Sequence, residues 1–153
     1  ASFEMVGHGI RPIPVEVDDL HRCIFHGLGI WLKGRADSWY TPQFRELARQ
    51  AYPIFREHAD IFRSRQCEPL VPTLQEDLYA NRFAGRDRTI ITLYNAGCSS
   101  VAGELMQVPL PPEWSVVSLL PRGEADAQRD KEQVTIRGTV APRSVAVFLL
   151  SAP

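Results

Sequence analysis

The feature that most constrains the fold is a long amphipathic segment, residues 41–64. Its apolar side chains recur at three- and four-residue spacing: Phe44, Leu47, Ala48, Ala51, Tyr52, Phe55, Ala59 and Phe62. That spacing places them on one face of an α-helix, with charged side chains on the other. Thr41 suits the N-cap, and Pro42 suits the first helical position, where no backbone N–H is needed. Pro53 removes an interior hydrogen bond, so we expect it to kink the helix or to begin a second one.

The pattern of the chain changes on either side of this helix. Before it, short strands alternate with helices, and after it the pattern is typical of strands alone. We therefore predict a junction between two domains, a β/α segment over residues 1–65 and an antiparallel β-sandwich over residues 66–153. The predicted fold class is α+β, in which a short β/α segment with a long helix is followed by the sandwich.

The first forty residues predict two β/α units. A strand at 3–6 precedes a helix at 15–25, for which Gly27 is a suitable left-handed cap. The stretch 28–32 is almost wholly apolar, which is typical of a parallel strand covered by helices. Two units cannot close a β/α barrel, which needs eight. They form either a small α/β layer on the β-domain or the last two units of a barrel whose remainder is absent.

The second part of the chain predicts seven short strands separated by turn signals. Their expected ranges are 70–73, 77–84, 88–95, 101–108, 114–120, 133–137 and 143–150. This number and spacing of strands favour a β-sandwich. The last strand is apolar on both faces, so we expect it in the centre of a sheet, whereas the polar run 122–132 predicts a solvated loop.

Charge and cysteine content exclude several function classes. The net charge of −1 gives no electrostatic basis for binding nucleic acid or an anionic membrane. No apolar run reaches the ~18 residues of a membrane span, and no signal peptide is visible. The three cysteines are Cys23, Cys67 and Cys98, and their spacing matches no zinc motif, so we predict no metal and no cofactor. Unpaired cysteines favour a reducing, cytoplasmic location.

Three stretches carry a resemblance to a known family: LHRCIFHGLGIWL (20–32), LYANRFAGRDRTIITLYNAG (78–97) and GTVAPRSVAVFLL (138–150). In this order they resemble the C-terminal end of a retaining-type glycoside hydrolase, in which a β/α (TIM) barrel is followed by an all-β domain. The α-amylase and α-galactosidase clans have this organisation. The first stretch resembles the final barrel helix and strand, and the other two resemble strands that open and close the sandwich.

The resemblance implies a C-terminal portion or subunit of a carbohydrate-active enzyme. Its sandwich would stabilise the barrel, and loops of residues 1–65 would line the rim of a sugar-binding cleft. A second chain, or the missing N-terminal barrel region, would then cover a large apolar surface on residues 1–65. Such enzymes use two carboxylates about 5–5.5 Å apart, which come from middle barrel strands. Neither Glu4 nor Asp37 has a partner at a suitable spacing, so no catalytic residue is assigned.

The candidate sugar-binding residues lie on the two loops that follow the predicted barrel strands. They are Trp31, Trp39 and Tyr40 as stacking surfaces, with Arg35, Asp37, His8 and Arg11 as hydrogen-bonding groups. Aromatic rings stack on the apolar faces of sugars, whereas core packing at Trp31 and cover of the long helix at Trp39 are the alternatives. We expect packing or solvent exposure, and no metal binding, for His21, His26 and His58. Core packing is expected for Trp114, Tyr79, Phe83 and Tyr94.

A second hypothesis is a self-contained β-sandwich with a helical extension, acting as a carbohydrate-binding or protein-interaction module. Behaviour in solution separates the two. A barrel remnant would aggregate or need a partner, because large exposed apolar patches are rarely tolerated. An independent module would be a well-behaved monomer with an aromatic platform.

Overall fold

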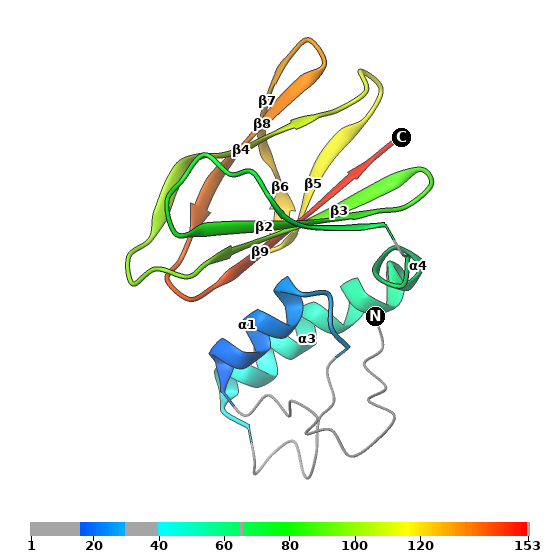
Figure 1. The fold of residues 1–153 in the computed structure, drawn as a ribbon. Helices are drawn as coiled ribbons and strands as arrows, with labels where there is room; N and C mark the ends of the chain where they lie inside the picture. The colour runs from blue at the N-terminus through cyan, green and yellow to red at the C-terminus, as the bar shows by residue number, and fades with distance from the viewer. Residues whose placement is uncertain (1–15, 30–39, 65, 153) are drawn as a thin grey trace.

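A computed structural model describes residues 16–29, 40–64 and 66–152 (Figure 1). Within these ranges the helices precede the strands. The helices are α1 (Val17–Phe25), α3 (Pro42–Glu57) and α4 (Ala59–Phe62). The strands are β1 (Cys67–Val71), β2 (Leu78–Ala84), β3 (Arg88–Asn95), β4 (Val101–Pro109), β5 (Ser115–Leu120), β6 (Arg122–Glu124), β7 (Asp126–Asp130), β8 (Gln133–Val140) and β9 (Val145–Ser151).

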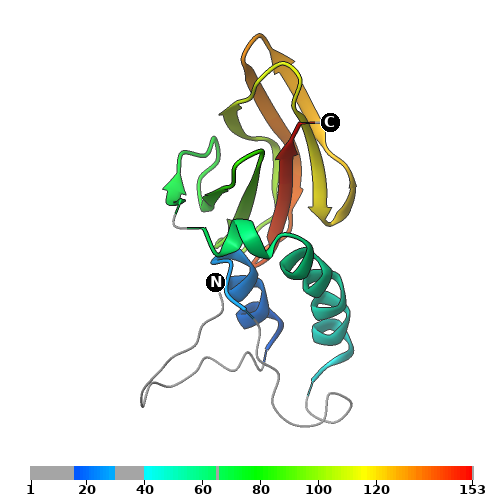
Figure 2. The same ribbon diagram turned by 90° about the vertical axis from the view of Figure 1, so that its right-hand side faces the viewer.

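The strands form two antiparallel sheets that pack face to face. One sheet has the order β1-β2-β3-β9-β5-β6, and the other has the order β4-β8-β7. The helices lie on the outer face of the six-stranded sheet, and the three-stranded sheet covers its inner face (Figures 1 and 2). The protein is therefore mostly antiparallel β-structure with few helices, and the predicted β-sandwich is present.

The six-stranded sheet separates two hydrophobic cores. Strand β9 shows the division, because Val145 and Val147 belong to the core under the helices, whereas Ala146 and Phe148 belong to the core between the sheets. This alternation follows from the two-residue period of a strand. Strand β9 lies between β3 and β5 and is buried on both faces, which confirms the expectation for the last strand.

The long helix begins as predicted but ends differently. The Thr41 hydroxyl accepts a hydrogen bond from the Phe44 N–H at 3.2 Å, and Pro42 occupies the first turn. Pro53 lies inside α3, and the break comes later, at His58, so the expected second helix does not begin at the proline. Burial of Ala51 and neighbouring apolar side chains against the sheet offsets the one hydrogen bond that Pro53 removes.

The helix α1 ends in a Schellman motif, as its glycine predicted. Gly27 has a φ of +65°, its N–H donates to the Ile24 carbonyl at 3.0 Å, and the Leu28 N–H donates to the Cys23 carbonyl at 2.9 Å. A Cβ at Gly27 would lie 2.8 Å from a ring carbon of Phe62, so both conformation and packing require glycine here.

Two expectations about the β-domain need correction. The run 122–132 is not a solvated loop, because it contains β6, which pairs with β5, and β7, which pairs with β8. All five side chains of β7 are exposed, so its polar sequence carries no sign of burial. Tyr79 of β2 is also not a core residue, since it is 45% exposed.

The barrel remnant remains a prediction. The proposed strand 3–6 and most of the proposed strand 28–32 lie outside the described residues, and Leu28 and Gly29 are not in a strand. The domain boundary at residue 65 also remains a prediction. In the described ranges 16–29 and 40–64, Tyr52, at 36%, is the one large hydrophobic side chain that is exposed, and the apolar surface expected on residues 1–65 stays a prediction.

Candidate functional site

The predicted sugar-binding residues fall mainly where the structure gives no description. His8, Arg11, Trp31, Arg35, Asp37 and Trp39 all lie outside the described residues. Tyr40 is described, and it is 6% exposed in the core between helices and sheet. Its ring stacks on Phe44, with centroids 4.5 Å apart and planes 24° from parallel. This burial corrects the expectation that Tyr40 is an exposed aromatic.

Two of the histidines have packing roles, as expected. His21 Nδ1 accepts a hydrogen bond from the Val145 N–H at 3.2 Å, which ties α1 to β9. His58 is buried at the break between α3 and α4, with its Nδ1 3.5 Å from an Arg88 nitrogen. Across residues 16–29, 40–64 and 66–152, no three His, Cys, Asp or Glu side chains gather as a set of metal ligands. None of the described helices has the length and hydropathy that crossing a membrane requires.

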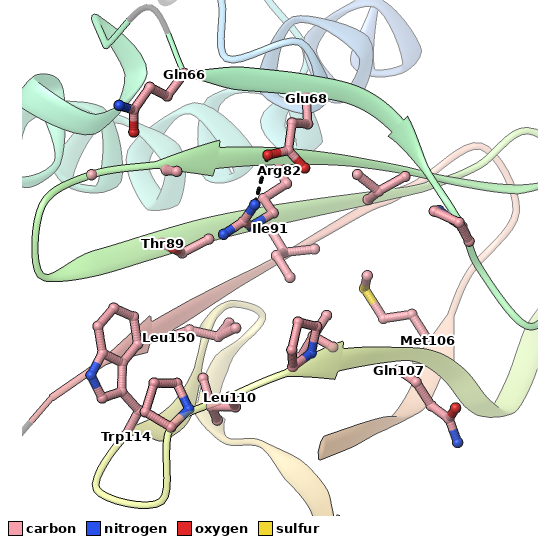
Figure 3. A pocket seen from close by; sticks show the side chains of 17 residues that line it. Gln66, Glu68, Arg82, Thr89, Ile91, Met106, Gln107, Leu110, Trp114 and Leu150 are labelled. Carbon is pink, nitrogen blue, oxygen red and sulfur yellow. Dashed lines mark hydrogen bonds and ion pairs between the residues drawn. The ribbon is translucent and has the colours of Figure 1, made fainter. Parts of the chain in front are cut away.

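A cavity of about 490 Å³ opens between the two sheets at one edge of the sandwich (Figure 3). This volume is within the range of roughly 300–1,000 Å³ that small-molecule sites occupy. Strands β1, β2 and β3 form one wall, and β4 with the turn that follows it forms the other. The strand order places β1 and β4 at the ends of their sheets, which is why the space between them stays open.

The floor of the cavity is apolar. Ile91, Met106 and Leu150 belong to the core between the sheets and reach the cavity from three different strands. Trp114 is half-buried and packs against the same core. The expectation that Trp114 is a core residue is therefore only partly met, because its ring also lines an open cavity (Figure 3).

The opposite wall is polar. Arg82 Nη1 donates to Glu68 Oε1 at 2.7 Å across β1 and β2, and both side chains remain partly exposed. Gln66, just before β1, also lines the cavity, whereas the amide of Gln107 on β4 points away from it and donates to Thr135 Oγ1 at 3.3 Å (Figure 3). In Figure 3 the ion pair and Trp114 lie on opposite sides of the space.

The turn that carries Trp114 is held from outside by a single arginine. Arg129 of β7 donates to the carbonyls of Leu110 at 2.9 Å and of Trp114 at 2.7 Å. Within the turn, the Trp114 N–H donates to the Pro111 carbonyl at 3.0 Å. Sequence reasoning missed this site, since it treated the residues around Arg129 as a loop. The one local signal was a proline-rich run directly before a tryptophan.

Comparison with known proteins adds a fold relationship. No protein-family model matches the sequence, and no curated protein matches it. Among solved structures, a protein of Bacillus halodurans provisionally assigned as an α-N-acetylgalactosaminidase matches with a TM-score of 0.59 at 13% identity, over 89% of this chain and 32% of the other. An α-amylase of Geobacillus thermoleovorans, complexed with acarbose, matches with a TM-score of 0.55 at 12% identity, over 87% and 32%.

A third similar structure is an α-amylase of Anoxybacillus, with a TM-score of 0.53 at 10% identity over 89% of this chain and 32% of that one. At these identities the comparison establishes the fold: the chain has a fold that also occurs in glycoside hydrolase structures. The chain spans about a third of the length of each of these three proteins.

Proposed function

We propose that this chain is the C-terminal portion or a subunit of a glycoside hydrolase, in which its β-sandwich stabilises a β/α barrel. The observation that carries the proposal is the extent of the structural match. A match over 89% of the chain is longer than residues 66–153, so it also takes in residues that precede the sandwich. The match is therefore not confined to the sandwich. The remaining two thirds of such an enzyme would contain most of the barrel.

The packing of the helices supports this role. Phe44 of α3 and Leu20 of α1 are buried in one cluster with Phe83 and Val147 of the six-stranded sheet. A barrel that included these helices would be anchored to the sandwich through this cluster. Removing the sandwich would expose that apolar surface to water, which is unfavourable by about 25 cal/mol for each Å² exposed.

In such an enzyme, catalysis and the lining of the cleft rim would come from different parts of the protein. The carboxylate pair that cleaves a glycosidic bond would come from barrel strands beyond these residues. The rim of the sugar-binding cleft is assigned to Trp39, Asp37, Arg35, Trp31, Tyr40, His8 and Arg11. Because Tyr40 is buried, we assign it to support of the rim through its stacking on Phe44.

The mass and activity of the native species test this proposal. An antibody against the exposed β6–β7 segment would isolate the protein from its source, with the free peptide as competitor in a control. We expect a polypeptide or assembly much heavier than the 17.2 kDa of this chain, together with hydrolysis of chromogenic glycosides. A monomer of 17.2 kDa without hydrolase activity contradicts the proposal and supports an independent binding module.

Within an active assembly, substitutions of Trp39 test whether this residue lines the rim of the sugar-binding cleft. Trp39→Ala is expected to raise KM, because it removes a flat apolar face, whereas Trp39→Phe retains an aromatic ring and should have a smaller effect. Equal KM values for the Ala variant and the unmodified enzyme would remove Trp39 from the rim.

A further inference from the structure

We propose that the cavity between the two sheets binds a neutral saccharide, with one sugar ring stacked on Trp114 and its hydroxyls bonded to the Glu68–Arg82 pair. This inference rests on the cavity alone and does not require the chain to be part of a hydrolase. The cavity combines an apolar floor, an aromatic ring and a few polar groups, which is the usual make-up of a small-molecule site. Its volume of about 490 Å³ suits a mono- or disaccharide unit.

The arrangement of polar and apolar walls matches the two surfaces of a pyranose ring. One face of the ring presents C–H groups, which pack on an aromatic face such as Trp114. The hydroxyls project from the rim of the ring, and they can both donate and accept hydrogen bonds. Glu68 offers acceptors and Arg82 offers donors from the opposite wall (Figure 3). Gln66 adds an amide, which can donate through its nitrogen and accept through its oxygen.

The charges at the cavity favour a neutral ligand over an ionic one. Among the described residues that line it, the charged side chains are Glu68 and Arg82, and they already form an ion pair. An anion or a cation would have to compete with that pair for its partner. A polyol can instead bond to the outer atoms of both groups and leave the pair intact.

The site is preorganised, which lowers the entropy cost of binding. The two hydrogen bonds from Arg129 and the internal Trp114–Pro111 bond fix the turn that carries the tryptophan. Prolines at 109, 111 and 112 restrict the same turn further. On the other wall, the ion pair limits the rotamers of Arg82. A ligand would therefore meet side chains that are already in place.

Titration of the 153-residue chain with saccharides tests the inference. The ligands are maltotriose, cellotriose, xylotriose and N-acetylgalactosamine, and the signal is the NMR cross-peak of the Trp114 indole N–H, assigned with Trp114→Phe. We expect at least one sugar to shift this peak in a saturable way. Trp114→Ala should weaken the affinity of that sugar about tenfold or more, as measured by calorimetry.

Variants of exposed side chains at or near the cavity between the sheets separate an effect on binding from an effect on folding. Glu68→Gln changes an exposed side chain and removes the ion pair, so the fold should persist while affinity falls severalfold. Tyr79→Ala is the matched control, because Tyr79 is an exposed aromatic that does not line the cavity, and its removal should leave affinity unchanged.

Several results would overturn the inference. One is the absence of a saturable shift with any of the sugars. Another is an affinity of Trp114→Ala equal to that of the unmodified chain, and another is a loss of binding in Tyr79→Ala alone. Saturable binding of an extended peptide, with none of a sugar, would also overturn it. Trp39→Ala should leave this affinity unchanged, so failure here is distinct from failure of the proposed hydrolase role.

Discussion

At the scale of single residues, Asn81 joins three elements. Its Nδ2 donates to the Phe25 carbonyl at the end of α1 at 3.1 Å, and its Oδ1 accepts from the Leu70 N–H of β1 at 3.1 Å. Thr92 of β3 donates to the same Phe25 carbonyl at 2.7 Å. Leu70 has a left-handed φ of 56°, so the bond from Asn81 holds a residue in a conformation that is unfavourable for leucine. The buried end of α1 is therefore satisfied by side chains of the sheet.

Asn81→Ala should destabilise the protein by about 1–3 kcal/mol, because it removes the buried hydrogen bond to the Phe25 carbonyl and the acceptor of the partly buried Leu70 N–H. Urea denaturation measures the change. Gln128→Ala, on the exposed strand β7, is the control and should stay within about 0.5 kcal/mol. A combined Asn81→Ala and Thr92→Val variant should be non-additive, since both side chains serve one carbonyl. A loss below about 0.5 kcal/mol for Asn81→Ala would contradict this account.

His58 and His21 make stability depend on pH. Burial lowers the pKa of His58, and the guanidinium of Arg88 lowers it further, whereas Glu57 and Asp60 act in the opposite sense. Burial also lowers the pKa of His21, against an opposing effect of Asp18. The lowered pKa favours the neutral imidazole of both residues in the folded protein, and His21 Nδ1 must carry no proton to accept the bond from β9.

The contribution of the two histidines to the free energy of unfolding should therefore be complete above the ordinary histidine pKa of about 6.5. It should decrease as the pH drops below that value. The folded-state pKa is the lowered one, so the unfolded chain takes up protons first. Denaturation between about pH 7.5 and pH 5 tests this, since acidic groups titrate at lower pH. The double variant His21→Gln, His58→Gln should have a flatter profile. An unchanged slope would show that these histidines do not set the pH dependence.

At the scale of elements, α3 contains an interior proline that its packing tolerates. Pro53→Ala should stabilise the protein by roughly 1–2 kcal/mol, because a helix hydrogen bond is gained and part of that gain is offset by a more flexible unfolded chain. Thermal denaturation with helical circular dichroism measures the effect. Arg56→Ala, an exposed change in the same helix, is the control. A lower melting temperature would mean that the packing of α3 requires the proline.

At the scale of the whole molecule, the six-stranded sheet couples the helices to the rest of the sandwich. Its strands supply side chains to the core under the helices and to the core between the sheets. A substitution that destabilises one core therefore also destabilises the other, because the same strands contribute to both. This predicts that helices and sheets unfold together.

Phe44→Ala should cost about 3–5 kcal/mol and lower the stability of both layers in one transition. Helical circular dichroism and hydrogen exchange of the β3 amides should report the same loss. Arg45→Ala, its exposed neighbour, should change little. Loss of the helical signal while the β3 amides remain protected would show that the layers unfold separately.

Local features of the sequence determined much of the secondary structure. The three- and four-residue period predicted α3, Gly27 predicted the end of α1, and the apolar pattern predicted β3 over the range that the structure has. These features depend on backbone geometry within a few residues, so they can be recognised without the rest of the molecule. The central position of β9 also followed, because a strand that is apolar on both faces must be covered twice.

Only the tertiary structure decided the placement of polar strands and the cavity. Strand β7 has no large apolar side chain and no buried one, and it is a strand because its backbone pairs with β8. Tyr79 and Phe83 lie on one face of β2, yet only Phe83 is covered by the helices. The cavity joins Glu68, Arg82 and Trp114, which are far apart in sequence. Contacts of this kind depend on which strands lie side by side, and periodicity within a strand does not carry that information.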